Sequence, residues 1–150
     1  MMVGLPASGK STLADRYSRE LGYTWLSSDK IRARISDNFN DRGSLNYHTF
    51  KSMNGLTIGL LSRGLSVIYD ATNLNRKDRK KILKEIAKIN EDHNIYVKAI
   101  YLNTPYNECV RRNNERDIKV PDEYMEMYRD KLQAPNLSEG FDAIEVLEGD

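Results

Sequence analysis

The sequence predicts an α/β fold of three layers, in which a parallel sheet of about five strands is flanked by helices. Short apolar runs alternate along the chain with longer stretches of helical periodicity, which is the pattern of such a sheet. A glycine-rich segment, 4–12, stands between the first apolar run and the first helical stretch. Polar residues directly follow two later runs, and ligands of parallel sheets bind beyond the carboxyl ends of the strands.

The first elements surround the glycine-rich segment. Residues 1–3 are predicted to form a strand, although strands usually have about five or six residues. Either this strand is short or residues are missing ahead of Met1, and a trimmed edge is the interpretation we expect. A helix should run from about Lys10 to Leu21, because Gly22 is favoured just past a helix end. The run 23–26 then predicts a short buried strand.

The next segment leads to a long helix. Residues 29–35 are expected to start a helix, and the polar residues 36–45 are expected to form a loop. A three-to-four spacing then predicts a helix that ends before Gly64. The residues with this spacing are Tyr47, Phe50, Asn54, Thr57 and Leu61.

The second half repeats the alternation of strand and helix. Strands are predicted at 65–69, 95–102 and 143–147. Helices are predicted after Asn75, after Pro105, and from Pro121 to about Gln133. The helix after Asn75 has an apolar stripe made of Ile82, Leu83, Ile86 and Ile89.

Composition bounds the answer without deciding the function. At 150 residues the chain is expected to be one domain, 1–150, and its formal charge of +1 neither favours nor excludes nucleic acid. Cys109 stands alone, so no intramolecular disulfide can form, and a buried structural thiol is expected. Neither Cys109 nor the two histidines, His48 and His93, has metal-ligand spacing. With no long apolar run and no signal peptide, a cytoplasmic protein is expected.

The segment 4–12 matches the phosphate-binding pattern G-x-x-x-x-G-K-[ST]. Its glycines let successive backbone N–H groups converge on phosphate oxygens, Lys10 supplies a charge, and the Ser11 hydroxyl is a ligand for Mg²⁺. A glycine-rich turn capped by serine is the alternative, but the strand–loop–helix context favours a nucleotide. The residues expected to bind ATP here are Gly4, Pro6, Ala7, Ser8, Gly9, Lys10, Ser11 and Thr12.

Two polar clusters follow predicted strands. Asp29 comes directly after one strand, with Arg32 one helical turn later, so a carboxylate able to accept a hydroxyl proton lies beside a guanidinium able to bind phosphate. Helix capping with a solvated ion pair is an equally good interpretation from spacing alone. Asp70 ends another strand, where a carboxylate that organises Mg²⁺ is expected, and Thr72 and Asn73 are candidates for substrate binding. Turn chemistry is the alternative for these residues.

Two basic segments are candidates for charge stabilisation. Arg112 and Arg116 are four residues apart and would project from one face of one helix, over the donor phosphates. A charged surface with Glu115 and Asp117 as partners is the alternative. The basic run 76–81 is a weaker candidate for nucleic-acid contact, and a solvated helix face is favoured. Four tyrosines are available for stacking: Tyr47, Tyr106, Tyr124 and Tyr128.

These segments together resemble the kinase domain of phage-type and bacterial polynucleotide 5′-kinases, within a broader group of small AAA-type and zeta-toxin-like P-loop kinases. The resemblance is carried by 4–12, by Ser28-Asp29-Lys30-Ile31-Arg32 and by Asp70-Ala71-Thr72-Asn73-Leu74-Asn75. Arg112-x-x-x-Arg116 with Val120-Pro121, and the tail 137–142, extend it over nearly the whole chain. It implies an adenylate-kinase-like sheet and a mobile lid around 111–121.

The resemblance also implies roles. Asp29 would be the general base for a 5′-hydroxyl, Arg32 would bind the neighbouring phosphate, and Thr72 with Asn73 would position that end. Lys10 and Ser11 would serve ATP and Mg²⁺, while Arg112 and Arg116 would clamp the donor phosphates. Ala71 separates Asp70 from Thr72, whereas phage-type relatives place the acid directly before the threonine. This departure implies that Asp70 serves the metal through water.

The sequence therefore predicts ATP-dependent transfer of a phosphoryl group to the 5′-hydroxyl end of RNA or DNA, as in end repair. A kinase of a small alcohol or a nucleoside is the alternative, and a non-catalytic ATP-binding module is a third hypothesis. Relatives of this kind are often fused to a phosphatase or ligase module, so we expect fusion to, or cooperation with, such a module.

Overall fold

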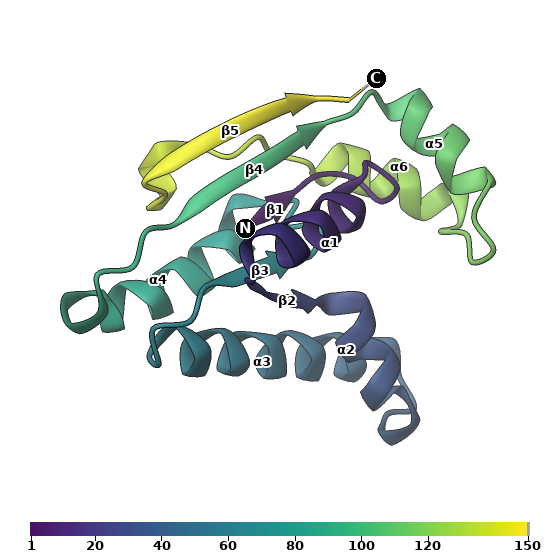
Figure 1. Cartoon of the computed structure of the whole chain (residues 1–150). Helices are drawn as coiled ribbons and strands as arrows, with labels where there is room; N and C mark the ends of the chain where they lie inside the picture. The colour runs from purple at the N-terminus through teal and green to yellow at the C-terminus, as the bar shows by residue number, and fades with distance from the viewer. Residues whose placement is uncertain (150) are drawn as a thin grey trace.

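Five parallel strands form a single sheet in the order β2-β3-β1-β4-β5. The computed structural model describes residues 1–149. The strands are β1 (Met2–Val3), β2 (Thr24–Ser27), β3 (Val67–Asp70), β4 (Lys98–Asn103) and β5 (Ala143–Glu148). The helices are α1 (Lys10–Leu21), α2 (Ser28–Ile35), α3 (Arg42–Leu61), α4 (Arg76–His93), α5 (Tyr106–Asn114) and α6 (Asp122–Lys131). Two short 3₁₀ turns are η1 (Ser36–Asn38) and η2 (Leu137–Glu139). The predicted three-layer fold is confirmed (Figure 1).

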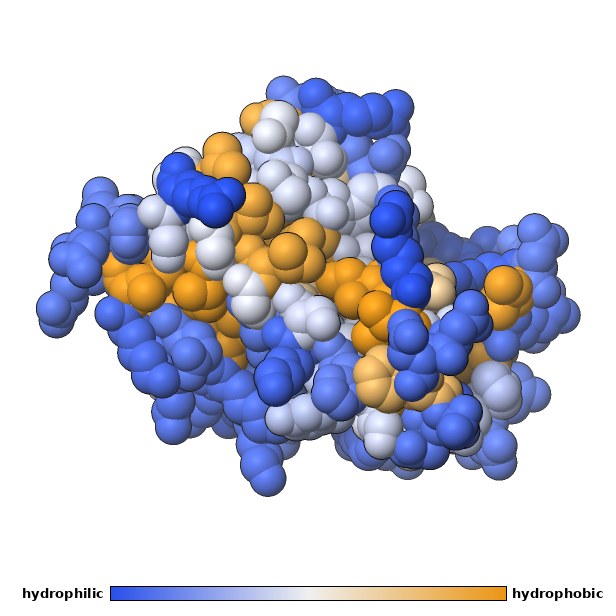
Figure 2. Space-filling model, turned by 90° about the horizontal axis from the view of Figure 1, so that it is seen from below, coloured by the Kyte–Doolittle hydropathy of each residue, from blue (hydrophilic) through white to orange (hydrophobic). Residues whose placement is uncertain are grey.

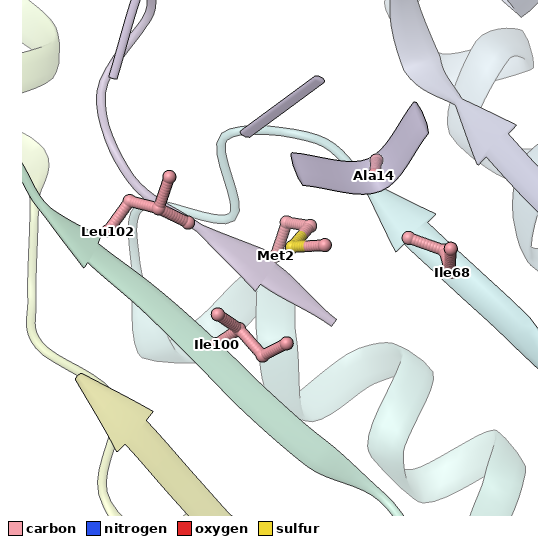
Figure 3. Packing of buried hydrophobic residues seen from close by; sticks show 5 residues of the cluster. All are labelled: Met2, Ala14, Ile68, Ile100 and Leu102. Atoms are coloured by element: carbon pink, nitrogen blue, oxygen red, sulfur yellow. The ribbon is translucent and has the colours of Figure 1, made fainter. Parts of the chain in front are cut away.

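Two apolar cores lie on opposite faces of this sheet. On one face α1 packs through Ala14 against strand residues Met2, Ile68, Ile100 and Leu102, which Figure 3 shows converging on one another. On the other face α3 and α4 pack through Met53, Ile82 and Ile86 against Tyr69. Strand β1 lies between these cores, so both of its residues are almost completely buried despite its length. This burial fixes the strand that leads into the glycine-rich segment.

Several expected element limits need correction, among them the start of β3, which lies at Val67 rather than at residue 65. The segment predicted as a loop, 36–45, contains η1 and the first residues of α3, because the Asp41 carboxylate accepts a hydrogen bond from the Ser44 N–H and caps α3 early. Ser27, rather than Ser28 or Asp29, caps α2. Strand β2 ends one residue later than expected, at Ser27, and is only partly buried. Strand β4 starts three residues late, because the turn at Asn94, with φ 47°, continues from α4.

Glycine has opposite roles at two positions, and this yields a stability prediction. At Gly4, φ is 156° and an added Cβ would lie 2.8 Å from the Ser8 Oγ and 3.0 Å from the Leu102 carbonyl oxygen. Gly4→Ala should therefore cost about 1–3 kcal/mol of unfolding free energy, measured in urea.

Gly55 provides the matched control. It lies inside α3, and an added Cβ would meet no atom within 4 Å. Leu56, the next residue of α3, is exposed to solvent. Figure 2 shows apolar side chains among hydrophilic ones on the face seen from below. Gly55→Ala should stabilise the protein by about 0.5–1 kcal/mol, because alanine loses less conformational entropy in a helix. Equal effects of the two substitutions would contradict the packing described for Gly4.

Candidate active site

The glycine-rich segment forms a loop at the carboxyl end of β1 and leads directly into α1 (Figure 1). Gly9 precedes the helix with φ 102°, and Ala7 also has a positive φ of 62°. The loop is tied to its surroundings by the Gly4 N–H, which donates to the Thr72 carbonyl (3.1 Å), and by the Thr104 hydroxyl, which donates to the Ser8 carbonyl (2.9 Å). Within residues 1–149 no cap side chain accepts from the start of α1, so the first N–H groups of this helix can bind a phosphate.

Lys10 lies folded back into this loop. Its Nζ donates to the Leu5 carbonyl oxygen at 2.5 Å and to the Ser8 Oγ at 3.4 Å. The side chain is buried, and this desolvation lowers the pKa of Lys10 to about 8, an effect that Asp70 partly offsets. Among residues 1–149, its Nζ donates only to these uncharged oxygens. A buried ammonium without an ionic partner destabilises the protein until an anion arrives, which suits a group that meets phosphate.

Lys10→Met tests this conflict between stability and binding. Burial lowers the pKa from 10.5 to about 8, so the amine stays mostly charged at neutral pH and this buried charge makes folding less favourable. Its removal should therefore stabilise the nucleotide-free protein by about 1–3 kcal/mol. Loss of the charge should weaken ATP binding at least about tenfold, by calorimetry. Lys84→Met, at an exposed position of α4, should change neither quantity. A less stable Lys10→Met protein would show that Lys10 has a structural role instead.

Ser11 and Asp70 meet beside the loop, as predicted for a magnesium site. The Ser11 hydroxyl donates to Asp70 Oδ2 at 3.0 Å, and the same oxygen accepts the Trp25 indole N–H at 3.0 Å. Asp70 is almost fully buried at the end of β3. A hydroxyl and a carboxylate fit Mg²⁺, which binds through a few protein oxygens and keeps several waters. The role of Trp25 was not foreseen, since it lies 45 residues from Asp70.

Asp29 and Arg32 form the predicted pair on the first turn of α2. Arg32 NH1 lies 2.8 Å from Asp29 Oδ1, and the carboxylate remains largely exposed, with 77% of its side-chain surface accessible. Arg32 Nε donates to the Asn46 Oδ1 of α3 at 3.0 Å. Asn46 was not identified from the sequence. Its position one turn before Phe50 places it on the face of α3 that packs against the protein. The pair can offer both a base and a phosphate-binding group to an acceptor.

Thr72 and Asn73 shape the loop after β3. Asn73 has a φ of 50°, and its side-chain amide donates to the carbonyls of Met2 (2.6 Å) and Ala71 (3.2 Å). Thr72 is half-buried, and its carbonyl receives the Gly4 N–H. The Asn73 side chain therefore fixes the backbone of the loop after β3. Thr72 takes part in these loop contacts through its carbonyl and not through its side chain.

Arg112 and Arg116 do not share one helix, which corrects the expectation from their spacing. Helix α5 ends at Asn114, so Arg112 lies on it and Arg116 lies in the turn beyond. The fully buried Asn113 causes this end, because its side chain exchanges two hydrogen bonds with the backbone of Val120, at 2.7 and 3.0 Å, and closes segment 114–119 into a loop. Arg112 lies beside Gly9, whose added Cβ would be 3.9 Å from Arg112 NH1, and its Nε also pairs with Glu108 at 2.6 Å.

A buried ion pair between Arg79 and Glu139 fixes the loop after β3. Arg79 and Glu139 make two hydrogen bonds, at 2.8 and 3.1 Å, and both side chains are almost fully buried. Arg79 NH1 also donates to the carbonyls of Asn73 and Leu74, in the loop after β3. Within the basic run 76–81, only Arg79 departs in this way from the expected solvated face. Periodicity could have indicated it, because Arg79 is in line with Ile82 and Ile86.

Four groups thus lie at the carboxyl edge of the sheet: the glycine-rich loop 4–12, the Ser11–Asp70 pair, the Asp29–Arg32 pair, and Arg112 beside Gly9. A protein-family model described as an AAA domain, AAA_33, matches residues 1–135. The chain belongs to the AAA_33 family. Its loop 4–12 has the P-loop pattern G-x-x-x-x-G-K-[ST].

Known sequences similar to this AAA_33 chain are longer. A protein of Acanthamoeba polyphaga mimivirus, described as a bifunctional polynucleotide phosphatase/kinase, is 30% identical over 98% of this chain and 32% of its own length. The L-seryl-tRNA(Sec) kinase of Methanococcus maripaludis is 28% identical over 97% of this chain and 56% of its own length. The chain therefore spans between about a third and about half of these curated relatives.

Solved structures share the fold at low identity. A protein described as a kinase, from Chloroflexus aurantiacus, has a TM-score of 0.76 and 18% identity, covering 98% of this chain and 82% of its own. A fungal RNA kinase has a TM-score of 0.70 and 17% identity, covering 100% and 73%. A gluconokinase from Sinorhizobium meliloti has 0.67 and 16%, covering 99% and 80%. Because these neighbours act on different acceptors by name, the fold alone does not choose one.

Three remaining expectations can be compared with residues 1–149. Cys109 is buried, as expected, and burial raises the pKa of its thiol. No group of three or more His, Cys, Asp or Glu residues is arranged to hold a metal within this range. Over the same residues, no helix is long and apolar enough to cross a membrane.

Proposed function

We propose that this AAA_33 chain is an ATP-dependent kinase that phosphorylates the 5′-hydroxyl end of RNA or DNA. The observation that carries the proposal is the Asp29–Arg32 pair, which faces solvent at the same sheet edge as the phosphate loop and is fixed by Asn46. A 5′-hydroxyl with a phosphate one sugar away presents a proton for a carboxylate and an anion for a guanidinium. A polynucleotide end therefore satisfies both members of the pair.

In this mechanism ATP binds with its phosphates on the loop 4–12 and its outer phosphates at Lys10. Ser11 and Asp70 would hold Mg²⁺, Asp70 through water, and the ion would supply positive charge against that of the phosphates. Asp29 accepts the proton of the 5′-hydroxyl as that oxygen bonds to the γ-phosphorus of ATP, in line with the bond to ADP that breaks. Arg32 and Thr72 hold the acceptor end, and ADP leaves. Arg112 and Arg116 offset the charge that develops on the leaving group.

The similarity to a protein described as a polynucleotide phosphatase/kinase supports this acceptor. It also supports fusion to, or cooperation with, a phosphatase module, because the matched part is about a third of that protein. The similarity to a seryl-tRNA(Sec) kinase supports an alternative acceptor, a primary alcohol carried on RNA. A small-molecule alcohol is the remaining alternative within the P-loop kinases.

Transfer of labelled γ-phosphate from ATP tests the proposal. The acceptors are a 5′-hydroxyl oligonucleotide, the same oligonucleotide with a 5′-phosphate, seryl-tRNA, a nucleoside and gluconate. We expect strong label on the 5′-hydroxyl oligonucleotide, removable by a phosphatase that acts on 5′ ends, weak label on the nucleoside, and none on the other three acceptors. Label on seryl-tRNA or gluconate alone would replace the proposed acceptor, and ATP binding without transfer to any of them would indicate a non-catalytic module.

A further inference from the structure

A second arginine on the acceptor side contacts an aromatic ring that belongs to the opposite side of the site. Arg42 is the first residue of α3, and its guanidinium carbon lies 4.9 Å from the centre of the Tyr124 ring on α6. The two residues are distant in sequence, and neither belongs to the groups described above. Their contact therefore joins the acceptor side of the site, α2 and α3, to the segment that follows the lid.

The position of this contact relative to Arg32 follows from helix geometry. Arg42 and Asn46 are four residues apart on α3, so their side chains lie one turn apart on the same face. Asn46 holds the guanidinium of Arg32, which in turn pairs with Asp29. The Arg42–Tyr124 contact is therefore the next position along the surface that begins at Asp29.

Tyr124 is held from behind. Its ring stacks on Tyr128, one turn later on α6, with centroids 6.5 Å apart and an interplanar angle of 29°. The Tyr124 N–H donates to the carbonyl of Pro121, which fixes the start of α6 directly after the lid segment. A supported ring with a cation over one face is the arrangement that binds a nucleobase, since base and guanidinium both bind to a π-face.

We propose that Arg42 and Tyr124 form the subsite for the second nucleotide of a single-stranded acceptor. The base of this nucleotide stacks on Tyr124, and Arg42, released from the ring, binds the phosphate on its 3′ side. The proposal rests on the proposed function, because it requires that the acceptor be a polynucleotide. It assigns the subsite to nucleotide chemistry shared by RNA and DNA.

Acceptor length is the variable that tests this subsite. A nucleoside 3′-monophosphate reaches Asp29 and Arg32 alone, whereas a 5′-hydroxyl dinucleotide or hexamer also reaches Arg42 and Tyr124. Tyr124→Ala should lower kcat/KM for the hexamer about 5- to 100-fold and leave that for the monophosphate within about twofold. Tyr124→Leu, which keeps an apolar side chain against Tyr128, should show the same loss, and Tyr124→Phe should retain full activity.

Arg42→Ala tests the charged half of the subsite. It should lower kcat/KM for the hexamer and also reduce its dependence on salt, since one phosphate contact is lost. Hexamers of RNA and of DNA are assayed side by side, so that a preference for one sugar is recorded in the same experiment.

Two controls match the variants. Arg129 lies on α6 like Tyr124, and its guanidinium carbon is 4.8 Å from the centre of the Tyr106 ring on α5. Tyr96 is an exposed tyrosine between α4 and β4. Arg129→Ala and Tyr96→Ala should leave the hexamer-to-monophosphate ratio unchanged. Equal losses for both acceptors in Tyr124→Leu, or no loss with the hexamer, overturn the subsite while the 5′-kinase function stands. A wild-type protein that phosphorylates neither acceptor overturns both proposals.

Discussion

Asp29→Asn is expected to lower kcat for a 5′-hydroxyl oligonucleotide by about 10²–10⁴-fold, the range of a lost general base. Asparagine has nearly the same shape as aspartate but cannot accept the hydroxyl proton. The carboxylate faces solvent and, within residues 1–149, pairs with Arg32 alone, so the substitution should leave the fold intact. ATP affinity, measured by calorimetry, should stay within about twofold, because the donor phosphates bind at loop 4–12.

Asp92→Asn is the matched control, at an exposed aspartate near the end of α4. It should retain wild-type kcat and wild-type ATP affinity. If Asp29→Asn keeps a kcat within a few-fold of the wild type, Asp29 is not the base and the Asp29–Arg32 pair is only a solvated ion pair at the start of α2.

Arg79→Met should cost about 3–5 kcal/mol of unfolding free energy, because it leaves the buried Glu139 carboxylate without its ionic partner. This is a large part of the roughly 5–15 kcal/mol by which a domain is stable. The substitution also removes the donors to the Asn73 and Leu74 carbonyls, so the loop after β3 should lose its fixed geometry. Urea unfolding gives the free energy.

Two further variants separate burial from charge. Lys88→Met removes an exposed partner of Glu85 and should change the unfolding free energy by less than about 1 kcal/mol. Arg79→Met combined with Glu139→Leu should recover part of the loss, because neither charge then stays buried alone. A single Arg79→Met variant that is as stable as Lys88→Met would contradict the role of the pair.

Much of the fold could be predicted because local signals coincide with the observed elements. Gly22, Asn75 and Pro105 lie next to helix ends as their residue types indicate, and Asp70 ends its strand as expected. The start of α3 within segment 36–45 could not be predicted. The polar composition of this segment favours a loop, whereas the Asp41 side chain caps a helix there. The fold was thus predictable where a local cap and an apolar period agreed.

The candidate site was predictable only within each segment. The Asp29–Arg32 pair follows from three-residue spacing on a helix. The hydrogen-bond partners that fix the site come from distant segments. Trp25 bonds to Asp70 across 45 residues, Asn46 to Arg32 across 14, and Glu139 to Arg79 across 60. The helical spacing of Arg112 and Arg116 also predicted a helix that continues past Asn114. Spacing cannot reveal the hydrogen bonds between Asn113 and Val120 that end α5. Such long-range pairs depend on the packing of the whole domain.

Arg32 is proposed to bind a phosphate beside the hydroxyl that is phosphorylated. The direct measurement is the ratio of kcat/KM for a nucleoside 3′-monophosphate to that for the nucleoside, in the wild type and in Arg32→Ala. A charge-assisted contact of about 1.5–3 kcal/mol predicts a wild-type ratio above about ten, which should fall close to one in the variant. An unchanged ratio in Arg32→Ala would contradict the account and would point to an acceptor without a neighbouring phosphate.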